Sequence, residues 1–245
     1  MIAPKMILFD YGNTLLCEPG YDLLRGNEAV FQCVKSNKNR LTAKQINDFS
    51  QQLFSGIGAA RDVGLELHER QFQRFLYEYL EIELSVSLAE AEKIFWDATS
   101  PGALMPNADK MIDSINARGI RSGVISNIGF SGAALTERIN RLLPRSKFEF
   151  IMASSEYMFR KPHPMLFELA LKKAGLAAKD VWFCGDNIEA DVEGAASAGI
   201  FPVWYEDMAM ENPWPNKYKR EYPHGPLCGH LHIHDWTELI AVLES

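Results

Sequence analysis

Four polar side chains follow apolar runs of the sequence, and together their types suit one kind of chemistry. Asp10, Ser126 and Asp186 each stand at the end of such a run, and Lys161 stands in the loop after another. In an open parallel sheet, ligands bind beyond the carboxyl ends of the strands. If the apolar runs are neighbouring strands, these four side chains meet at one edge of the sheet.

The carboxylates predict a cation at that edge. Carboxylates that lie close together repel one another unless a cation lies between them. The hard cation that carboxylates bind beside a phosphate is Mg²⁺. We therefore expect Asp10 and Asp186 to bind Mg²⁺, with Asp191 supporting the site from behind.

The other residues suit a phosphoryl group. Ser126 and Asn127 offer a hydroxyl, a side-chain amide and backbone N–H groups to phosphoryl oxygens. Lys161 supplies positive charge that offsets both a nucleophile and a developing oxyanion. A carboxylate nucleophile at Asp10 that forms an aspartyl-phosphate is consistent with this set. Taken singly, each residue also suits an ordinary role, such as a turn, a helix cap or a solvated charge.

Strands and helices alternate in the parts of the chain that carry these residues, which predicts a doubly wound parallel sheet. Short apolar runs predict buried strands, and apolar residues at helical spacing predict the helices between them. The expected fold class is α/β, with a Rossmann-like three-layer α/β/α core. The predicted strands are 6–9, 119–126, 148–153, 181–185 and 201–205, and the predicted helices are 109–118, 136–142, 163–174 and 191–198.

Residues 18–99 interrupt this alternation and predict an inserted, all-helical domain. Apolar residues at helical spacing follow an expected N-cap at Thr42. Ser87 with Glu90 predicts a capping box at the start of another helix. The core domain is then predicted to consist of residues 1–17 and 100–245.

Composition limits the classes of partner. The chain has 245 residues and a formal net charge of −7, which disfavours sequence-independent nucleic-acid binding, although one pocket can still be positive. No apolar run approaches the roughly 20 residues that cross a bilayer, and the N-terminal run is too short for a signal peptide. The four cysteines form no C-x-x-C pair, so we expect a reducing, cytoplasmic location.

Four motifs resemble those of the haloacid dehalogenase superfamily. They are FDYGNTL at 9–15, VISN at 124–127, RKP at 160–162 and GDNIEAD at 185–191. All four stand in the family's order and on the expected strand ends. The resemblance covers almost the whole chain and fails only around 206–229, and the helical insertion is similar to the first type of cap (C1) in the phosphatase-like branch.

The resemblance implies a Mg²⁺-dependent hydrolase that acts on a small phosphorylated metabolite. It implies that Asp10 attacks phosphorus, that Ser126 and Lys161 hold the phosphoryl group, and that Asp186 binds Mg²⁺ with Asp10. The family takes a further metal ligand from the backbone carbonyl two residues after the nucleophile, which here is Gly12. A cap that covers the site favours a small substrate over a macromolecule.

Gly12 also departs from the family's pattern. Phosphatases of the family usually carry an Asp there, which protonates the leaving alcohol and then activates water. General acid–base help contributes on the order of 10²–10⁴-fold. Another side chain or a bound water takes over, or the leaving group needs no acid, or the protein binds ligands and turns over poorly; the sequence leaves these explanations open.

A phosphatase is the function that we favour from the sequence. The alternative from another class is a phosphate-ligand-binding or regulatory protein that is weakly catalytic or inactive. The dehalogenase branch also lacks the second Asp, so a 2-haloacid hydrolase is a further alternative. Against it, Gly185-Asp186 is similar to the metal-binding phosphatase version of the last motif.

Three features stand outside the motifs. Alternating histidines near Cys228 suggest transition-metal ligands, but their alternation favours a final edge strand before a helix at 237–243. The aromatic, proline-rich segment within 206–229 fits a surface loop, an active-site flap or a homodimer contact. For Arg61, a solvated surface position is favoured over contact with the substrate. The histidines are His230, His232 and His234, and the aromatic residues are Trp214, Tyr218 and Tyr222.

Overall fold

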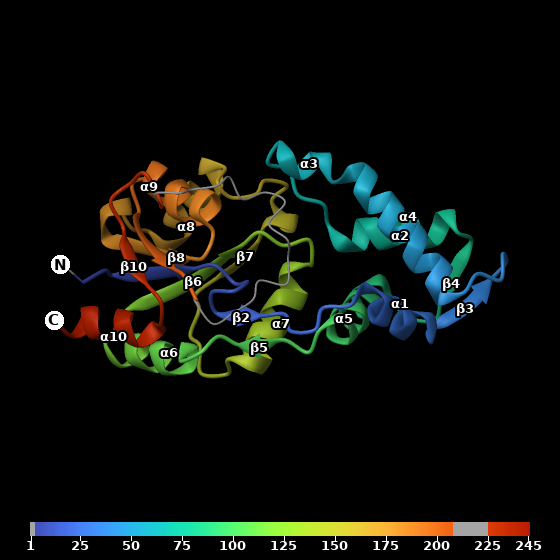
Figure 1. Ribbon diagram of the computed structural model, residues 1–245, viewed down its shortest axis with the longest axis horizontal. Helices are drawn as coiled ribbons and strands as arrows, with labels where there is room; N and C mark the ends of the chain where they lie inside the picture. Colours follow the sequence, from blue (N-terminus) through green and yellow to red (C-terminus); the bar gives the residue numbers. More distant parts are fainter. Residues whose placement is uncertain (1–2, 208–224) are drawn as a thin grey trace.

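The computed structural model describes residues 3–207 and 225–245, and its centre is a parallel sheet of six strands (Figure 1). Every neighbouring pair of strands in this sheet is parallel. The predicted Rossmann-like α/β fold is confirmed. In spatial order the strands are β10 (Leu231–Ile233), β9 (Phe201–Tyr205), β8 (Val181–Gly185), β1 (Met6–Phe9), β6 (Arg121–Ser126) and β7 (Ile151–Ala153).

Strand β1 shows how the chain builds a layer on each face of the sheet. All four of its side chains are buried, and successive side chains of a strand point to opposite faces. Ile7 and Phe9 join the apolar cluster that contains residues of α6, α7 and α10. Met6 and Leu8 join the cluster that contains residues of α8 and α9. The helices are α6 (Ala108–Ala117), α7 (Gly132–Leu142), α8 (Pro164–Ala174), α9 (Gly194–Ser197) and α10 (Trp236–Glu244).

Short helical turns complete the core. Two of them are 3₁₀ turns, and the third is a π-helical turn between β8 and α9. Among the residues that the structure describes, no helix is long and apolar enough to cross a membrane. The turns are η1 (Ser154–Glu156), η2 (Ala178–Asp180) and η3 (Ile188–Glu193).

The inserted segment forms a separate group of helices beside the core (Figure 1). Thr42 and Gln45 form a reciprocal capping box at the start of α2. At the start of α5, the structure gives only the Ser87 side chain accepting from the Glu90 N–H. The helices are α1 (Leu23–Phe31), α2 (Ala43–Ile57), α3 (Ala59–Asp62), α4 (Glu69–Tyr79) and α5 (Leu88–Thr99).

The inserted segment also contains a small sheet that the sequence did not predict. Strand β3 (Val34–Asn37) pairs antiparallel with β4 (Ile82–Leu84). Both strands are short, and 44 residues separate them in the sequence. The segment is therefore mainly, but not entirely, helical; the domain boundaries at 17/18 and 99/100 stay a prediction.

The two passages of chain between core and insertion run side by side. Strand β2 (Leu16–Cys17) pairs antiparallel with β5 (Ala103–Leu104). Arg138 of α7, which is buried, donates to Glu18 Oε2 at 2.6 Å and to the Ser100 carbonyl at 2.7 Å. The Arg138 guanidinium therefore hydrogen-bonds both passages to α7 of the core.

A second attachment joins the insertion to the core farther along the chain. Leu65 forms an antiparallel bridge with Phe159. The Glu66 N–H donates to the Met158 carbonyl at 2.6 Å, and the Arg160 N–H donates to the Gly64 carbonyl at 2.9 Å. The insertion is thus hydrogen-bonded to the loop that leads directly into Lys161.

The side chain of Glu66 strengthens this attachment. Its carboxylate is fully buried and accepts from Arg61 Nε at 3.0 Å and from Ser154 Oγ at 2.9 Å. Arg160 also forms an ion pair with it. Because hydrogen bonds to charged groups are stronger than neutral ones, this carboxylate holds the insertion and the core together at one buried point.

Candidate active site

Asp10 is held in place by the sheet. It is the first residue after β1, and its backbone N–H donates to the Cys184 carbonyl of β8 at 2.9 Å. Its side chain lies almost wholly out of solvent. Lys161 Nζ donates to Asp10 Oδ1 at 2.6 Å. The predicted nucleophile Asp10 is therefore in direct contact with the predicted positive charge of Lys161.

Lys161 lies between two carboxylates. Its Nζ is 2.6 Å from Asp10 Oδ1 and 2.6 Å from Asp191 Oδ1. Burial alone lowers the pKa of a lysine, but here the charges of Asp10 and Asp191 outweigh burial and raise the pKa of Lys161 above its ordinary value. The ammonium therefore stays charged over the physiological pH range.

The pKa of Asp191 is also raised, which for a carboxyl group favours the neutral form. Burial raises its pKa above the ordinary value, with Lys161 opposing that rise and Asp10 adding to it. The physical reason is that a single ammonium faces two buried carboxylates, which leaves one excess negative charge in the pocket. An additional cation, or an incoming positive charge, would stabilise the ionised form of this pocket.

Gly185 makes room for Asp191. A Cβ at position 185 would lie 2.4 Å from Asp191 Cγ, a distance that real Cβ atoms do not show. The other side of the carboxylate is fixed, because the Asn187 N–H donates to Asp191 Oδ2 at 3.0 Å. The glycine that ends β8 is thus required by the aspartate six residues later.

Three carboxylates lie close enough together to bind one hard cation. Asp10, Asp186 and Asp191 each offer one oxygen, and these three oxygens all lie within 4.8 Å of one another. Oxygen ligands from carboxylates are those that Mg²⁺ prefers. The donor set fits Mg²⁺, with Asp10 and Asp186 as predicted ligands and Asp191 behind them.

Two of the three residues predicted to bind phosphate lie at the end of β6; the third is Lys161. Ser126 is the last residue of β6 and is buried. Asn127 follows it, and its side chain pairs with the backbone of Lys161 twice: Nδ2 donates to the Lys161 carbonyl at 2.9 Å, and the Lys161 N–H donates to Oδ1 at 2.7 Å. The side-chain amide therefore joins the loop after β6 to the loop that carries Lys161.

Gly12 lies in the loop beyond Asp10. It forms an isolated bridge with Leu16. A Cβ built at Gly12 meets no atom within 4 Å. The position is therefore open, so either a substrate group or the side chain of a substituted residue has space there.

Other residues considered from the sequence lie elsewhere. Arg61 is not free in solvent as the favoured interpretation had it: it pairs with Glu66 and lies over the Phe54 ring at 4.8 Å. His232 lies on β10, so the predicted edge strand is confirmed. Glu66 was not foreseen, because its partners on the core, Ser154 and Arg160, lie far along the chain and no local pattern marks it. Trp214, Tyr218 and Tyr222 lie outside the residues that the structure describes.

A comparison with models of known protein families supports the family predicted from the four motifs. A family model described as a haloacid dehalogenase-like hydrolase matches residues 4–199. The chain belongs to this family. The predicted superfamily is therefore confirmed, and with it the assignment of the chain to a family of hydrolases.

Known haloacid dehalogenase-like proteins resemble the chain to different extents. Glyceraldehyde 3-phosphate phosphatase of Pyrococcus abyssi is 30% identical over 102 residues, which is 42% of each chain. A phosphatase structure from Thermococcus onnurineus superposes with a TM-score of 0.63 at 19% identity, covering 97% of both chains. A 2-haloacid dehalogenase structure from Pseudomonas syringae gives 0.62 at 20% identity, covering 100% of this chain and 99% of the other.

These similarities show the fold of the chain but not which reaction it catalyses. The match with the Pyrococcus abyssi phosphatase spans less than half of that protein's length. The two structures are nearly equal in similarity although one is called a phosphatase and the other a dehalogenase. They therefore show the shared fold, and the choice of reaction depends on the residues of the site.

Proposed function

We propose that the protein hydrolyses a small phosphate monoester, with Mg²⁺, through an aspartyl-phosphate on Asp10. The observation that carries this proposal is the buried contact of Lys161 with Asp10, beside a carboxylate cluster that fits Mg²⁺. The phosphatase relative supports phosphate ester hydrolysis in general. The cluster also favours a phosphatase over a 2-haloacid hydrolase, because a monoester dianion needs the positive charge that a metal adds.

The first step requires a nucleophile and a place for negative charge. Asp10 Oδ attacks phosphorus, the bond from phosphorus to the ester oxygen breaks, and the phosphoryl group remains on Asp10. Lys161, with Ser126 and Asn127, stabilises the charge on the phosphoryl oxygens. Bound Mg²⁺ supplies further charge stabilisation and orients the phosphate. Asp10 contacts Lys161 already, so the positive charge is in place before substrate binds.

The second step is release of phosphate from Asp10 by water. The family's usual acid–base group is replaced by Gly12, whose surroundings are open. We propose that water or a substrate group in this space gives a proton to the departing ester oxygen in the first step. In the second step water attacks phosphorus, the bond from phosphorus to Asp10 breaks, and the proton of that water passes to the released phosphate. Turnover should therefore be slower than with an Asp at this position, by a factor within the roughly 10²–10⁴ that general acid–base catalysis contributes.

Phosphate release from p-nitrophenyl phosphate tests the reaction. We expect release with Mg²⁺, loss of release with EDTA, and loss of release in Asp10→Asn with Mg²⁺ present. Asp48→Asn is the matched control, because it makes the same change at a solvent-exposed residue of α2 whose partner is Lys44. Absence of metal-dependent release across a broad panel of phosphate esters would refute the hydrolase proposal.

The variant Gly12→Asp separates an enzyme from a binding protein. The new side chain has space, so the fold should be kept. An inert natural protein that gains turnover on this substitution would be a phosphate-binding protein with a pocket that lost its acid–base group. A natural protein that already turns over rules out the purely binding alternative.

The insertion supports a preference for small substrates. We propose that residues 18–99 form a cap over the site, since residues 64–66 are bonded to the loop before Lys161. A cap that excludes water also hinders access by a macromolecule. A panel of metabolite phosphates and phosphoproteins tests this point, and activity on phosphoproteins alone would contradict it.

A further inference from the structure

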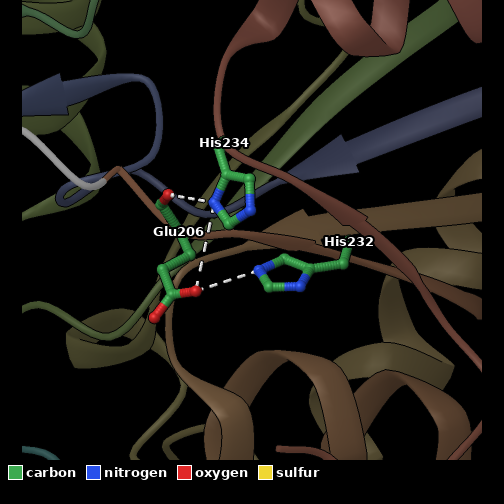
Figure 2. Close-up of side chains that lie close together, drawn as sticks. All are labelled: Glu206, His232 and His234. Atoms are coloured by element: carbon green, nitrogen blue, oxygen red, sulfur yellow. Dashed lines mark hydrogen bonds and ion pairs between the residues drawn. The ribbon is translucent and has the colours of Figure 1, made fainter.

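Two histidines and a glutamate converge at the β9–β10 edge of the sheet (Figure 2). His232 Nε2 lies 3.0 Å from Glu206 Oε2, and His234 Nδ1 lies 4.0 Å from the same oxygen. The three ligand atoms all lie within 4.8 Å of one another. In Figure 2 both imidazole rings approach the same side chain, that of Glu206.

The sheet itself brings these side chains together. His232 lies on β10, and His234 comes directly after the buried Ile233 that ends the strand. Their rings lie beside each other, with centroids 4.4 Å apart. Strand β9 runs parallel to β10 and ends at Tyr205, and the Glu206 N–H that follows donates to the Ile233 carbonyl at 2.9 Å. The edge strand predicted from the alternation is therefore also what sets the spacing of the histidines.

The distances suit a metal ion. Zinc binds histidine nitrogen and carboxylate oxygen at about 2.0–2.2 Å, so two of its ligands lie about 3–3.5 Å apart at common coordination angles. The separation of 3.0 Å already meets this, and the separation of 4.0 Å needs a small rotation of a solvent-exposed side chain. Two imidazoles with one carboxylate are a donor set for zinc and related transition metals rather than for Mg²⁺.

We propose that Glu206, His232 and His234 form a binding site for a divalent transition metal, of which Zn²⁺ is the representative. The site is separate in composition from the carboxylate cluster at Asp10, which offers only oxygen ligands. Cys228 does not belong to it, because its sulfur lies against the Val192 carbonyl. The proposal does not depend on phosphatase activity.

The ordinary alternative is a cluster held by hydrogen bonds and protons. In that case His232 and Glu206 form an exposed ion pair, and His234 Nδ1 donates to the Glu206 carbonyl at 3.1 Å. Such exposed pairs contribute little stability. Metal binding distinguishes the metal site from the ion pair. Only a metal site binds Zn²⁺ with an affinity that falls when either histidine is replaced.

The site lies next to the candidate active site through one aromatic residue. The Trp204 ring is stacked on His232, with ring centroids 4.0 Å apart. The same indole N–H donates to the Asp186 carbonyl at 3.2 Å. Trp204 therefore contacts both sites, and its fluorescence should report metal binding at His232.

Zinc titration of the full-length protein tests the proposal. In millimolar Mg²⁺, which keeps the carboxylate cluster filled, calorimetry should give one Zn²⁺ bound per chain. His232→Ala and His234→Ala should each weaken binding at least about 10-fold, since even outer-sphere changes weaken metal sites 10–100-fold. His230→Ala is the matched control, because His230 bonds the Cys228 carbonyl at 2.8 Å and its ring centre lies 6.2 Å from that of His232.

Each outcome decides the point. Zinc binding that survives both alanine substitutions, or no zinc binding at all, overturns the proposal, and so does an equal loss in His230→Ala. Electron paramagnetic resonance of the natural protein with Cu²⁺, again in Mg²⁺, needs no variant. Hyperfine coupling to two nitrogens supports the assigned ligands, whereas a spectrum from oxygen ligands alone refutes them.

Discussion

Lys161→Met should destabilise the folded protein as well as abolish its activity. The substitution removes the ammonium that lies 2.6 Å from both Asp10 and Asp191 and leaves an apolar chain of similar length. The pocket then holds two buried carboxylates without a counter-charge, where it previously had one excess negative charge. Since Lys161 is buried, solvent does not replace the lost charge.

The size of the effect follows from breaking a buried ion pair. Removal of one partner typically costs about 3–5 kcal/mol of the free energy of unfolding. In a chain of 245 residues, where about 2–4 °C corresponds to 1 kcal/mol, the melting temperature should fall by about 6–20 °C. Added Mg²⁺ should recover part of this loss, because the freed carboxylates bind it and the ligand stabilises the folded state, by about 2.7 kcal/mol at 100 times the Kd.

Thermal unfolding followed by circular dichroism, with EDTA and with Mg²⁺, measures this. The double variant Lys161→Met with Asp191→Asn restores the original count of one excess negative charge. It should therefore melt above the single variant in EDTA. A single variant that melts with the natural protein, or a double variant that melts no higher than the single one, would refute the electrostatic account of this pocket.

Three other substitutions test the neighbouring structure. Glu66→Ala should lower the free energy of unfolding by about 3 kcal/mol in chemical denaturation, because it removes a buried carboxylate from its arginine partners. Burial and the Glu92 charge raise the pKa of Glu69 to about 7, so its folded form binds a proton more tightly than the unfolded chain and stability falls as pH rises from about 4.5 to 7. Glu69→Gln should therefore flatten that part of the melting profile and melt above the natural protein at pH 8; an unchanged slope would contradict this. In Gly26→Ala, the new Cβ would lie 2.2 Å from Thr99 Oγ1, which should cost about 1–3 kcal/mol and show as a lower denaturant midpoint with an unchanged denaturant slope.

Local sequence patterns determine most of the core. The strands expected at 6–9, 181–185 and 201–205 have those bounds in the structure. The pattern is clear there because these strands are buried and apolar. Strand β7 is shorter than the predicted 148–153: Ile151–Ala153 pair in register with β6, while Glu149 and Phe150 are joined to β6 by single backbone hydrogen bonds. Strands β3 and β4 were missed, since each is only half-buried and depends on a partner far along the chain.

The candidate site was predictable for a related reason. Asp10, Ser126 and Asp186 stand at or directly after strand ends, so the parallel topology brings them to one edge. Lys161 lies in the loop beyond β7 and is held at that edge by its backbone hydrogen bonds to Asn127. Glu66 and Glu206 were not predictable in this way. Their neighbours, Arg160 and His232, are supplied by tertiary contacts that no short-range pattern encodes. The sequence therefore predicts what the sheet positions and misses what side chains assemble across loops.

The contact between Asp10 and Lys161 has a consequence for folding kinetics. The two residues are 151 positions apart, and the whole insertion lies between them in the sequence. Contacts of such high sequence separation form late, because the entropy of closing the intervening chain must be met first. In a refolding experiment, the return of the proposed phosphatase activity should therefore lag behind the return of helical circular dichroism, and this activity would report the final step of assembly.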